Sequence, residues 1–215
     1  FKNEILSASK EHRFFHWCIE FPEVFANDGG FDVMCGNPPW DKLQMEEEKW
    51  FIGKDNDIVK AANQNERKRK IAALEYTDPS LFNEFISAGK GIASQSSFVK
   101  QSGRFPLTSV GKLELSSLFA ELCLSFSKEA WGLVLPTGIA VNDSNKAFFS
   151  KLIDENRLMS LYDFENKEAL FDIHRMFKFC LLTAGKEQPQ PRTVKGGFYL
   201  TRLDHLLDPK RVYSL

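Results

Sequence analysis

The segment FDVMCGNPPWDKL, residues 31–43, runs an apolar stretch of strand length into a stiff polar corner. FDVMCG is short and mostly apolar, which is typical of a strand that is covered on both faces. Pro38 and Pro39 have fixed φ angles and no N–H group, and each forces the residue before it into an extended conformation. The corner therefore ends the strand, and its carbonyl groups cannot all be used within a sheet.

Further apolar runs of strand length follow this corner. They occupy residues 131–136, 158–164 and 177–184, with a weaker candidate at 196–203. Helical patterns separate the first three strands, and this alternation predicts an α/β fold with a mostly parallel sheet and flanking helices. Residues 41–110 are polar and helix-like, then rich in glycine and serine, and are interpreted as a mainly helical insertion. The basic run 67–70 is expected on a solvated helix face, with a phosphate contact as the alternative.

Two amphipathic helices are expected between the strands. The first carries apolar residues at helical spacing: Leu115, Leu118, Phe119, Leu122 and Phe126. Ser144 or Asp143 is a candidate N-cap for the second helix. The expected buried face of that helix consists of four apolar residues: Phe148, Phe149, Leu152 and Ile153.

Composition argues against several classes of protein. With 43% hydrophobic and 27% charged residues in 215, the chain is expected to be globular and soluble, with no membrane span. Its net charge of −1 argues against a protein that binds nucleic acid through electrostatic attraction alone.

Four cysteines lie far apart in apolar contexts: Cys18, Cys35, Cys123 and Cys180. Their spacing predicts reduced, buried thiols, and without a signal peptide the chain is expected in the cytoplasm. His12 and His16 lack a nearby third ligand, so no metal site is expected.

The polar corner is the candidate site, because ligands of doubly wound sheets bind beyond the carboxyl ends of the strands. The side-chain oxygen of Asn37 and the carbonyl oxygen of Pro38 are two acceptors at a fixed separation, which suits an –NH₂ group. Trp40 adds a flat face on which a planar base could stack, worth about 1–3 kcal/mol. Accepting both amino hydrogens favours a pyramidal nitrogen whose lone pair can attack a methyl group. The alternative is a stiff turn with Trp40 packed on the core.

The motif GNPPW after FDVM resembles the catalytic loop of N6-adenine-specific DNA methyltransferases, in particular the long enzymes of restriction–modification and phage-exclusion systems (type IIG- or BREX-like). Further segments resemble this family in the same order: FHWCIEFPEVF, SGRFPLT, LVLPTGIAVND, LYDFEN and IHRMFKFCLLT. The resemblance implies a partial class I (Rossmann-like) S-adenosylmethionine-dependent methyltransferase fold. It also implies double-stranded DNA as partner and flipping of the target adenine out of the duplex.

The resemblance implies a role for each residue of the motif. Asn37 and Pro38 would accept from the adenine amino group, Pro39 would keep the loop rigid, and Trp40 would stack on the flipped base. A second aromatic side chain of the family packs on the adenine from another side, and by spacing Phe171 matches it best, although Phe164 and Phe177 lie close by. Arg175 is a weaker candidate for a DNA phosphate contact.

The sequence also departs from the family. No glycine-rich loop for S-adenosylmethionine precedes the motif, so cofactor-binding residues are not assigned. Residues 1–185 are therefore expected to be the second half of a methyltransferase catalytic domain, and 186–215 an extension toward a further domain. The cofactor-binding half and a target-recognition domain would be supplied by the same parent chain, and this piece alone is expected to be inactive.

Two other functions remain open at this stage. The chain could be a non-catalytic DNA-docking or assembly module, or part of a methyltransferase acting on a protein glutamine amide. Whatever the function, the strand at 31–36 would normally pair with the missing first half of the domain, so in this piece alone it would present an open edge. That edge is expected to be hidden by self-association or covered by the N-terminal segment.

Overall fold

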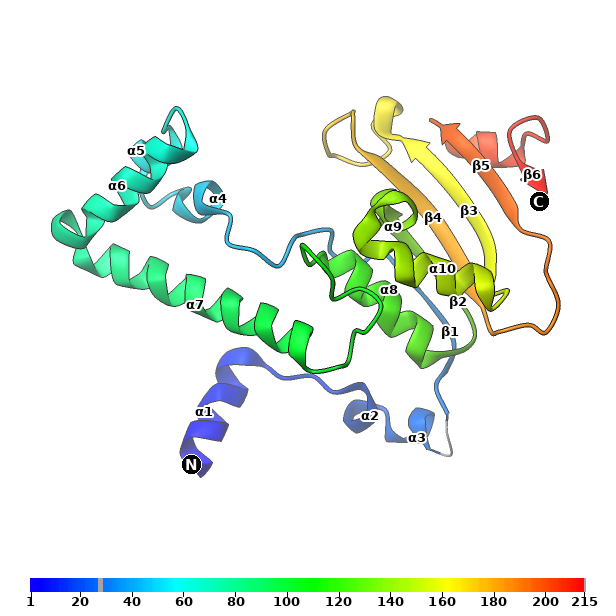
Figure 1. The fold of residues 1–215 in the computed structure, drawn as a ribbon, viewed down its shortest axis with the longest axis horizontal. Coiled ribbons are helices and arrows are strands. Elements are labelled where there is room, and N and C mark those ends of the chain that lie inside the picture. Colours follow the sequence, from blue (N-terminus) through cyan, green and yellow to red (C-terminus); the bar gives the residue numbers. More distant parts are fainter. Residues whose placement is uncertain (27–28, 215) are drawn as a thin grey trace.

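The computed structural model describes residues 1–26 and 29–214, with only the backbone of residues 11 and 12. Within these ranges the chain forms a six-stranded sheet in the order β1-β2-β4-β3-β5-β6 (Figure 1). The strands are β1 (Phe31–Gly36), β2 (Ser127–Pro136), β3 (Leu158–Glu165), β4 (Lys178–Gly185), β5 (Lys195–Leu200) and β6 (Tyr213–Ser214). The five strands predicted from apolar runs are all present, and the two-residue β6 was not predicted.

The sheet is mixed, which corrects the prediction of a mostly parallel sheet. β1 is parallel to β2 and β3 is parallel to β5, but β4 is antiparallel to both of its neighbours, β2 and β3. The cause is the connection from β3 to β4, which has only the short 3₁₀ turn η2 (Asn166–Glu168) and no α-helix to carry the chain across the sheet. β1, β2, β3 and β5 still point the same way, so their carboxyl ends share one edge.

Three helices cover one face of the sheet: α8 (Leu115–Phe126), α9 (Gly138–Val141) and α10 (Lys146–Asp154) (Figure 1). The core lies between these helices and the sheet. Its fully or nearly fully buried side chains include Trp131, Leu133 and Leu135 of β2, Cys180 and Leu182 of β4, and Phe148 and Leu152 of α10. The α/β class with flanking helices is confirmed.

The start of α10 differs from the prediction. Asp143 and Ser144 lie in the preceding 3₁₀ turn η1 (Asp143–Asn145), and Asn145 occupies the N-cap position without a capping hydrogen bond. Its side chain is buried instead, where Nδ2 donates to the Gly138 carbonyl oxygen at 3.0 Å. Ile153 is 52% exposed rather than buried, because it lies about 100° around the helix from Leu152.

The opposite face of the sheet holds a smaller aromatic cluster near the carboxyl ends of the strands. Phe164, Phe179 and Leu200 are buried there, and Trp40 and Phe171 pack against them. Coverage of both faces, predicted for the strands, is not found along β1. There Val33 is 62% exposed, because β1 is an outer strand of the sheet and has only β2 as a described neighbour.

The predicted burial of all four thiols is wrong for two of them. Cys123 and Cys180 are buried in the core, whereas Cys18 and Cys35 are exposed. Cys35 is exposed because it lies on the outer strand β1, and Cys18 because it lies on the short helix α2 (Trp17–Glu20), which has no buried residue.

The N-terminal segment contains α1 (Lys2–His12), α2 and α3 (Pro22–Phe25). Its aromatic side chains gather at the start of β1, where the ring of Trp17 meets Phe31 edge-on at 5.6 Å and Phe25 meets Phe126 at 5.2 Å. This cluster anchors the beginning of β1 but leaves Val33 exposed. The N-terminal segment therefore covers the edge only at the start of β1, and the alternative, self-association of the chain, stays a prediction.

Four helices of the predicted insertion form a projection that extends away from the sheet (Figure 1). They are α4 (Glu47–Phe51), α5 (Asn56–Val59), α6 (Gln64–Thr77) and α7 (Pro79–Gln101). They enclose a separate small core of Phe51, Ile58, Ile71 and Leu74. Asp55, Asn63 and Asp78 cap α5, α6 and α7 with side-chain hydrogen bonds, so local sequence accounts for each helix start.

The projection is fixed to the sheet domain at the point where the chain returns from α7. The buried carboxylate of Glu121 on α8 accepts from the main-chain N–H groups of Leu107 and Thr108 at 3.0 and 2.9 Å. The Thr108 hydroxyl donates to the same carboxylate at 2.6 Å.

Among the helices that the structure describes, none has the length and apolar character needed to cross a bilayer. The last helical turn, η3 (Leu203–Leu207), follows β5.

Candidate active site

The predicted site residues lie at the shared carboxyl edge of β1, β2 and β3. The corner Asn37–Trp40 follows β1, Thr137 follows β2, and the loop 166–177 follows β3 and leads into β4. The sheet therefore brings the polar corner and the loop that carries Phe171 to one place, although they are more than a hundred residues apart in sequence.

Asn37 is exposed to solvent, and its side chain has no hydrogen-bond partner among the described residues. Pro38 is half-buried, and Pro39 is exposed. An amide at this position can accept a hydrogen bond from a ligand without first breaking one inside the protein.

Trp40 is half-buried and held in one orientation. Its Nε1–H donates to the main-chain oxygen of Val134 on β2 at 3.2 Å. The indole lies nearly parallel to the ring of Phe177, with centroids 6.3 Å apart and planes at 19°. It also lies against Phe179, at 6.3 Å and 28°. Trp40 therefore packs on the aromatic cluster of the sheet and also lines a cavity, and the stacking of a base on it stays a prediction.

Phe171 and Phe177 both contact Trp40, but in different ways. Phe171 is half-buried and meets Trp40 edge-on, with ring centroids 5.8 Å apart, and it also meets Phe179 at 4.9 Å. Phe177 is 48% exposed and lines the cavity beside Trp40, which Phe171 does not. The contact of Phe171 with a base stays a prediction, and Phe177 is the aromatic ring better placed to reach one.

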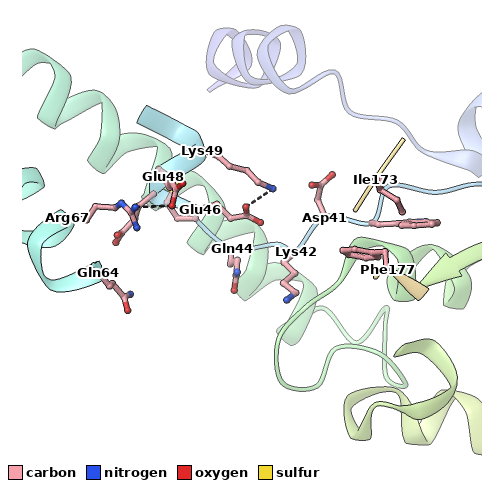
Figure 2. A pocket seen from close by; sticks show the side chains of 13 residues that line it. Asp41, Lys42, Gln44, Glu46, Glu48, Lys49, Gln64, Arg67, Ile173 and Phe177 are labelled. Carbon is pink, nitrogen blue, oxygen red and sulfur yellow. Dashed lines mark hydrogen bonds and ion pairs between the residues drawn. The ribbon is translucent and has the colours of Figure 1, made fainter. Parts of the chain in front are cut away.

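The cavity has a volume of about 970 Å³ and lies between the sheet edge and the projection. Figure 2 shows Phe177 and Ile173 at one end, and Arg67, Gln64 and Glu48 at the other. Ion pairs fix its polar wall: Arg67 to Glu48 at 2.9 Å and Lys49 to Glu46 at 2.7 Å. The hydrogen bond from Lys49 to Glu46 raises the pKa of the lysine. One end of the cavity is therefore aromatic and the other is charged.

A buried asparagine that the sequence analysis missed organises the loop after β3. Asn166 is fully buried, and its Nδ2 donates to the carbonyl oxygens of Phe171 and Ile173 at 3.0 and 3.1 Å. Its Oδ1 accepts from the N–H of Phe171 at 3.0 Å. The position directly after an apolar strand, in LYDFEN, is the available sequence signal, and it does not distinguish a buried asparagine from a turn residue.

Asp163 and Thr137 form a second polar contact at this edge that the sequence analysis missed. The Thr137 hydroxyl donates to Asp163 Oδ1 at 2.6 Å, and Asp163 is only 7% exposed. Burial, with a contribution from the negative charge of Asp163, raises the pKa of the neighbouring Cys180 to about 12. Cys180 is therefore an unreactive core thiol.

The charged candidates fall into two groups. Arg175 is exposed and free to meet a phosphate, as the prediction requires. In the basic run 67–70, Arg67 is bound to Glu48, and Lys70 donates to the Asp57 carbonyl oxygen at 2.9 Å. These two residues stabilise the projection, which leaves Lys68 and Arg69 on its solvated face.

The way the chain enters and leaves β1 bears on where S-adenosylmethionine could bind, because such cofactors bind beyond the carboxyl ends of strands. The chain leaves β1 through the proline corner rather than through a glycine-rich turn into a helix. A Cβ atom added at Gly36 would meet nothing within 4 Å, so the space on that side of its Cα is open, while its backbone pairs with Leu133 of β2. Among the described residues, no group of three or more His, Cys, Asp or Glu side chains could hold a metal ion, and the side chain of His12 lies outside them.

Comparisons with known proteins identify what the chain resembles. No curated protein sequence matches it. Among solved structures it is similar to the type IIG restriction endonuclease BpuSI, with 18% identity over 88% of this chain and 17% of that chain and a TM-score of 0.46. It is similar to a nuclease-deletion mutant of the type ISP restriction-modification enzyme LlaGI in complex with a DNA substrate mimic, with 15% identity over 82% and 15% of the two chains and a TM-score of 0.40.

A third similar structure is the type I restriction-modification system methyltransferase subunit from Streptococcus thermophilus, with 16% identity over 48% of this chain and 22% of that chain and a TM-score of 0.35. The chain spans 15 to 22% of the length of these three proteins. Residues 1–100, which include the Asn37–Trp40 corner, match the family model described as Eco57I restriction-modification methylase. Over those residues, the chain is similar to the Eco57I restriction-modification methylase family.

Proposed function

We propose that this chain is the catalytic-loop half of a DNA methyltransferase that methylates the N6 amino group of adenine in double-stranded DNA. The observation that carries the proposal is the arrangement at the carboxyl end of β1. There an exposed Asn37 amide without a described partner lies three residues from an indole that a hydrogen bond to Val134 holds in place.

The roles of the chain's own residues follow from their hydrogen-bonding capacity. Asn37 Oδ1 and the Pro38 carbonyl oxygen would accept the two hydrogens of the amino group. Holding both hydrogens draws the nitrogen toward a pyramidal shape and makes its lone pair available for attack. Residues 37–40 contain no titratable side chain, so positioning rather than proton abstraction is the contribution of this corner.

The base would be held by aromatic faces. The adenine is stacked inside a duplex and must be flipped out before its amino group can reach Asn37. Trp40 and Phe177 line one end of the cavity and offer the faces on which the flipped base would lie. Stacking on one such ring is worth about 1–3 kcal/mol, which offsets part of the cost of unstacking the base.

S-adenosylmethionine would supply the methyl group. The described residues before β1 form α1, α2 and α3 rather than a strand that ends in a glycine-rich turn, and on this ground we place its binding site, together with the DNA target-recognition domain, in further parts of the protein. On this proposal residues 1–215 alone bind no cofactor and transfer no methyl group.

The test is product analysis with protein that carries the cofactor-binding part together with this chain. The protein is incubated with methyl-labelled S-adenosylmethionine and a pool of adenine-containing duplexes, and the nucleosides are then separated by mass spectrometry. Label in N6-methyladenine supports the proposal. Label on a protein glutamine, or duplex binding without any methyl transfer, contradicts it and favours one of the two alternative functions. In a parallel titration, binding of S-adenosylmethionine by residues 1–215 alone would disprove the assignment of its site to other parts of the protein.

A further inference from the structure

The tip of the loop between β3 and β4 presents an exposed apolar side chain beside the base site. Met176 is 82% exposed, more than Ile173 at 37% or Phe177 at 48%. Three exposed apolar side chains thus lie within five residues of one loop next to the candidate site, and a cluster of this kind marks a contact surface for a partner.

The backbone on both sides of Met176 is held in place. The Met176 N–H donates to Nδ1 of His174 at 3.2 Å, and the Phe177 N–H donates to the His174 carbonyl oxygen at 2.9 Å. The Phe177 carbonyl oxygen accepts from the N–H of the buried Asn166 at 3.1 Å. The side chain of Asn166 acts at the other end of the tip, where its Nδ2 donates to the Ile173 carbonyl oxygen at 3.1 Å. Met176 therefore lies in a turn that hydrogen bonds hold on both sides.

Met176 lies between two residues to which the proposed function gives a role. Its neighbour Phe177 stacks on Trp40 and lines the cavity, so Met176 is one residue from the proposed base site. On the other side, the exposed Arg175 can meet a phosphate of the same duplex.

We propose that Met176 is a wedge that enters the base stack of duplex DNA and fills the space that the flipped adenine leaves. The inference rests on the proposed function and extends it to how the duplex is opened. Proteins that open duplexes insert apolar side chains, methionine included, between base steps, and so offset the cost of unstacking. An unbranched methionine side chain adapts to the irregular gap between two bases. The partner of this tip is therefore a base-paired duplex rather than a single strand.

The test compares two substrates that differ only in how firmly the target adenine is held. One is a fully paired duplex, and the other has an abasic site opposite the target adenine, so that little pairing opposes flipping. Met176→Ala is expected to reduce methyl transfer about tenfold or more on the paired duplex and less than about twofold on the abasic duplex. Met176→Leu keeps an apolar wedge and should stay near wild type on both. Tyr76→Ala, which removes a side chain that is 84% exposed on α6, is the matched control and should change neither.

A second readout follows flipping itself. With 2-aminopurine at the target position, the wild-type protein should raise its fluorescence when the base leaves the stack, and Met176→Ala should lose most of this rise on the paired duplex. Equal loss on both substrates would show a structural defect and overturn the wedge, as would full activity on the paired duplex. All these measurements use protein that carries the cofactor-binding part together with this chain. If that protein with the wild-type sequence methylates neither duplex, the proposed function itself fails, which is a different result.

Discussion

Trp40 and Val134 are 94 residues apart in sequence, and the indole Nε1–H of the first donates to the main-chain oxygen of the second at 3.2 Å. This hydrogen bond connects the loop after β1 to β2, the strand that runs parallel to β1. The bond holds the indole in one orientation, nearly parallel to the ring of Phe177.

Replacing Trp40 tests this relationship in two steps. Trp40→Phe keeps an aromatic face and loses the hydrogen bond, so it should lower the free energy of unfolding by about 1 kcal/mol and retain part of the duplex affinity. Trp40→Leu also removes the stacking face, which should cost a further 1–3 kcal/mol or so in binding of the flipped base. Chemical denaturation and duplex titration measure the two effects. Equal duplex affinity of the two variants would show that the ring is only a core element.

Asn37→Ala should separate chemistry from folding. The side chain is exposed and has no described partner, so the free energy of unfolding should change by no more than about 0.5 kcal/mol. Methyl transfer by the cofactor-containing protein should fall by about 100-fold or more, the scale seen when one preorganised polar group is removed from the reacting atoms. Duplex affinity should be nearly unchanged. A variant that keeps most of its activity would show that Asn37 does not bind the amino group.

Replacing Asn166 with alanine should, unlike Asn37→Ala, lower the free energy of unfolding. Asn166→Ala leaves the Phe171 N–H and two carbonyl oxygens without their partner in a buried place. The free energy of unfolding should fall by about 2–3 kcal/mol, because unsatisfied buried polar groups are costly. Hydrogen exchange should accelerate at Phe171 in particular. Asn37→Ala is the matched control, being the same change at an exposed position, and similar stability losses in the two variants would contradict the assignment.

The sequence predicted correctly those features that depend on residues close together in the chain, and missed those that depend on contacts between distant segments. Apolar runs are local, so β1 to β5 and the helix Leu115–Phe126 could be recognised from their own residues. The direction of β4 could not, because it depends on how residues 166–177 connect two strands rather than on the strand itself. Likewise, the corner Asn37–Trp40 has a local signature, but the roles of Asn166 and Val134 arise only when distant segments meet.

The choice between Phe171 and Phe177 illustrates the same limit. Spacing alone favoured Phe171, and both rings do contact Trp40. Which of them faces the cavity depends on the turn at His174, where the backbone reverses just before β4. A chain with twenty phenylalanines offers no compositional signal that would distinguish a ring in the core from one in a site.

The cysteines provide a test of burial that is independent of activity. Burial raises the pKa of Cys123 to about 11 and that of Cys180 to about 12, above the ordinary value of 9.0, so at pH 8 both stay protonated in the folded protein. Cys18 and Cys35 are exposed. Brief treatment of the folded protein with an alkylating reagent at pH 8 should therefore label these two thiols, and denaturation should expose the other two. Mass spectrometry of the labelled peptides would contradict the fold if Cys180 reacted as fast as Cys35.

The outer edge of β1 predicts how the isolated chain behaves in solution. Val33 and Cys35 are exposed on a strand whose described hydrogen bonding is to β2 alone, and an unpaired edge of this kind is a template for another strand. Residues 1–215 should therefore associate in a concentration-dependent way in analytical ultracentrifugation. Val33→Lys should weaken the association, because a charged side chain on an edge strand opposes pairing.

Lys128 and Asp32 already form an ion pair at 2.9 Å beside this position, so Asp32→Asn offers a control that alters charge at the same edge without adding a lysine. A stable monomer whose amides exchange rapidly throughout residues 31–36 would show that the open edge does not drive self-association.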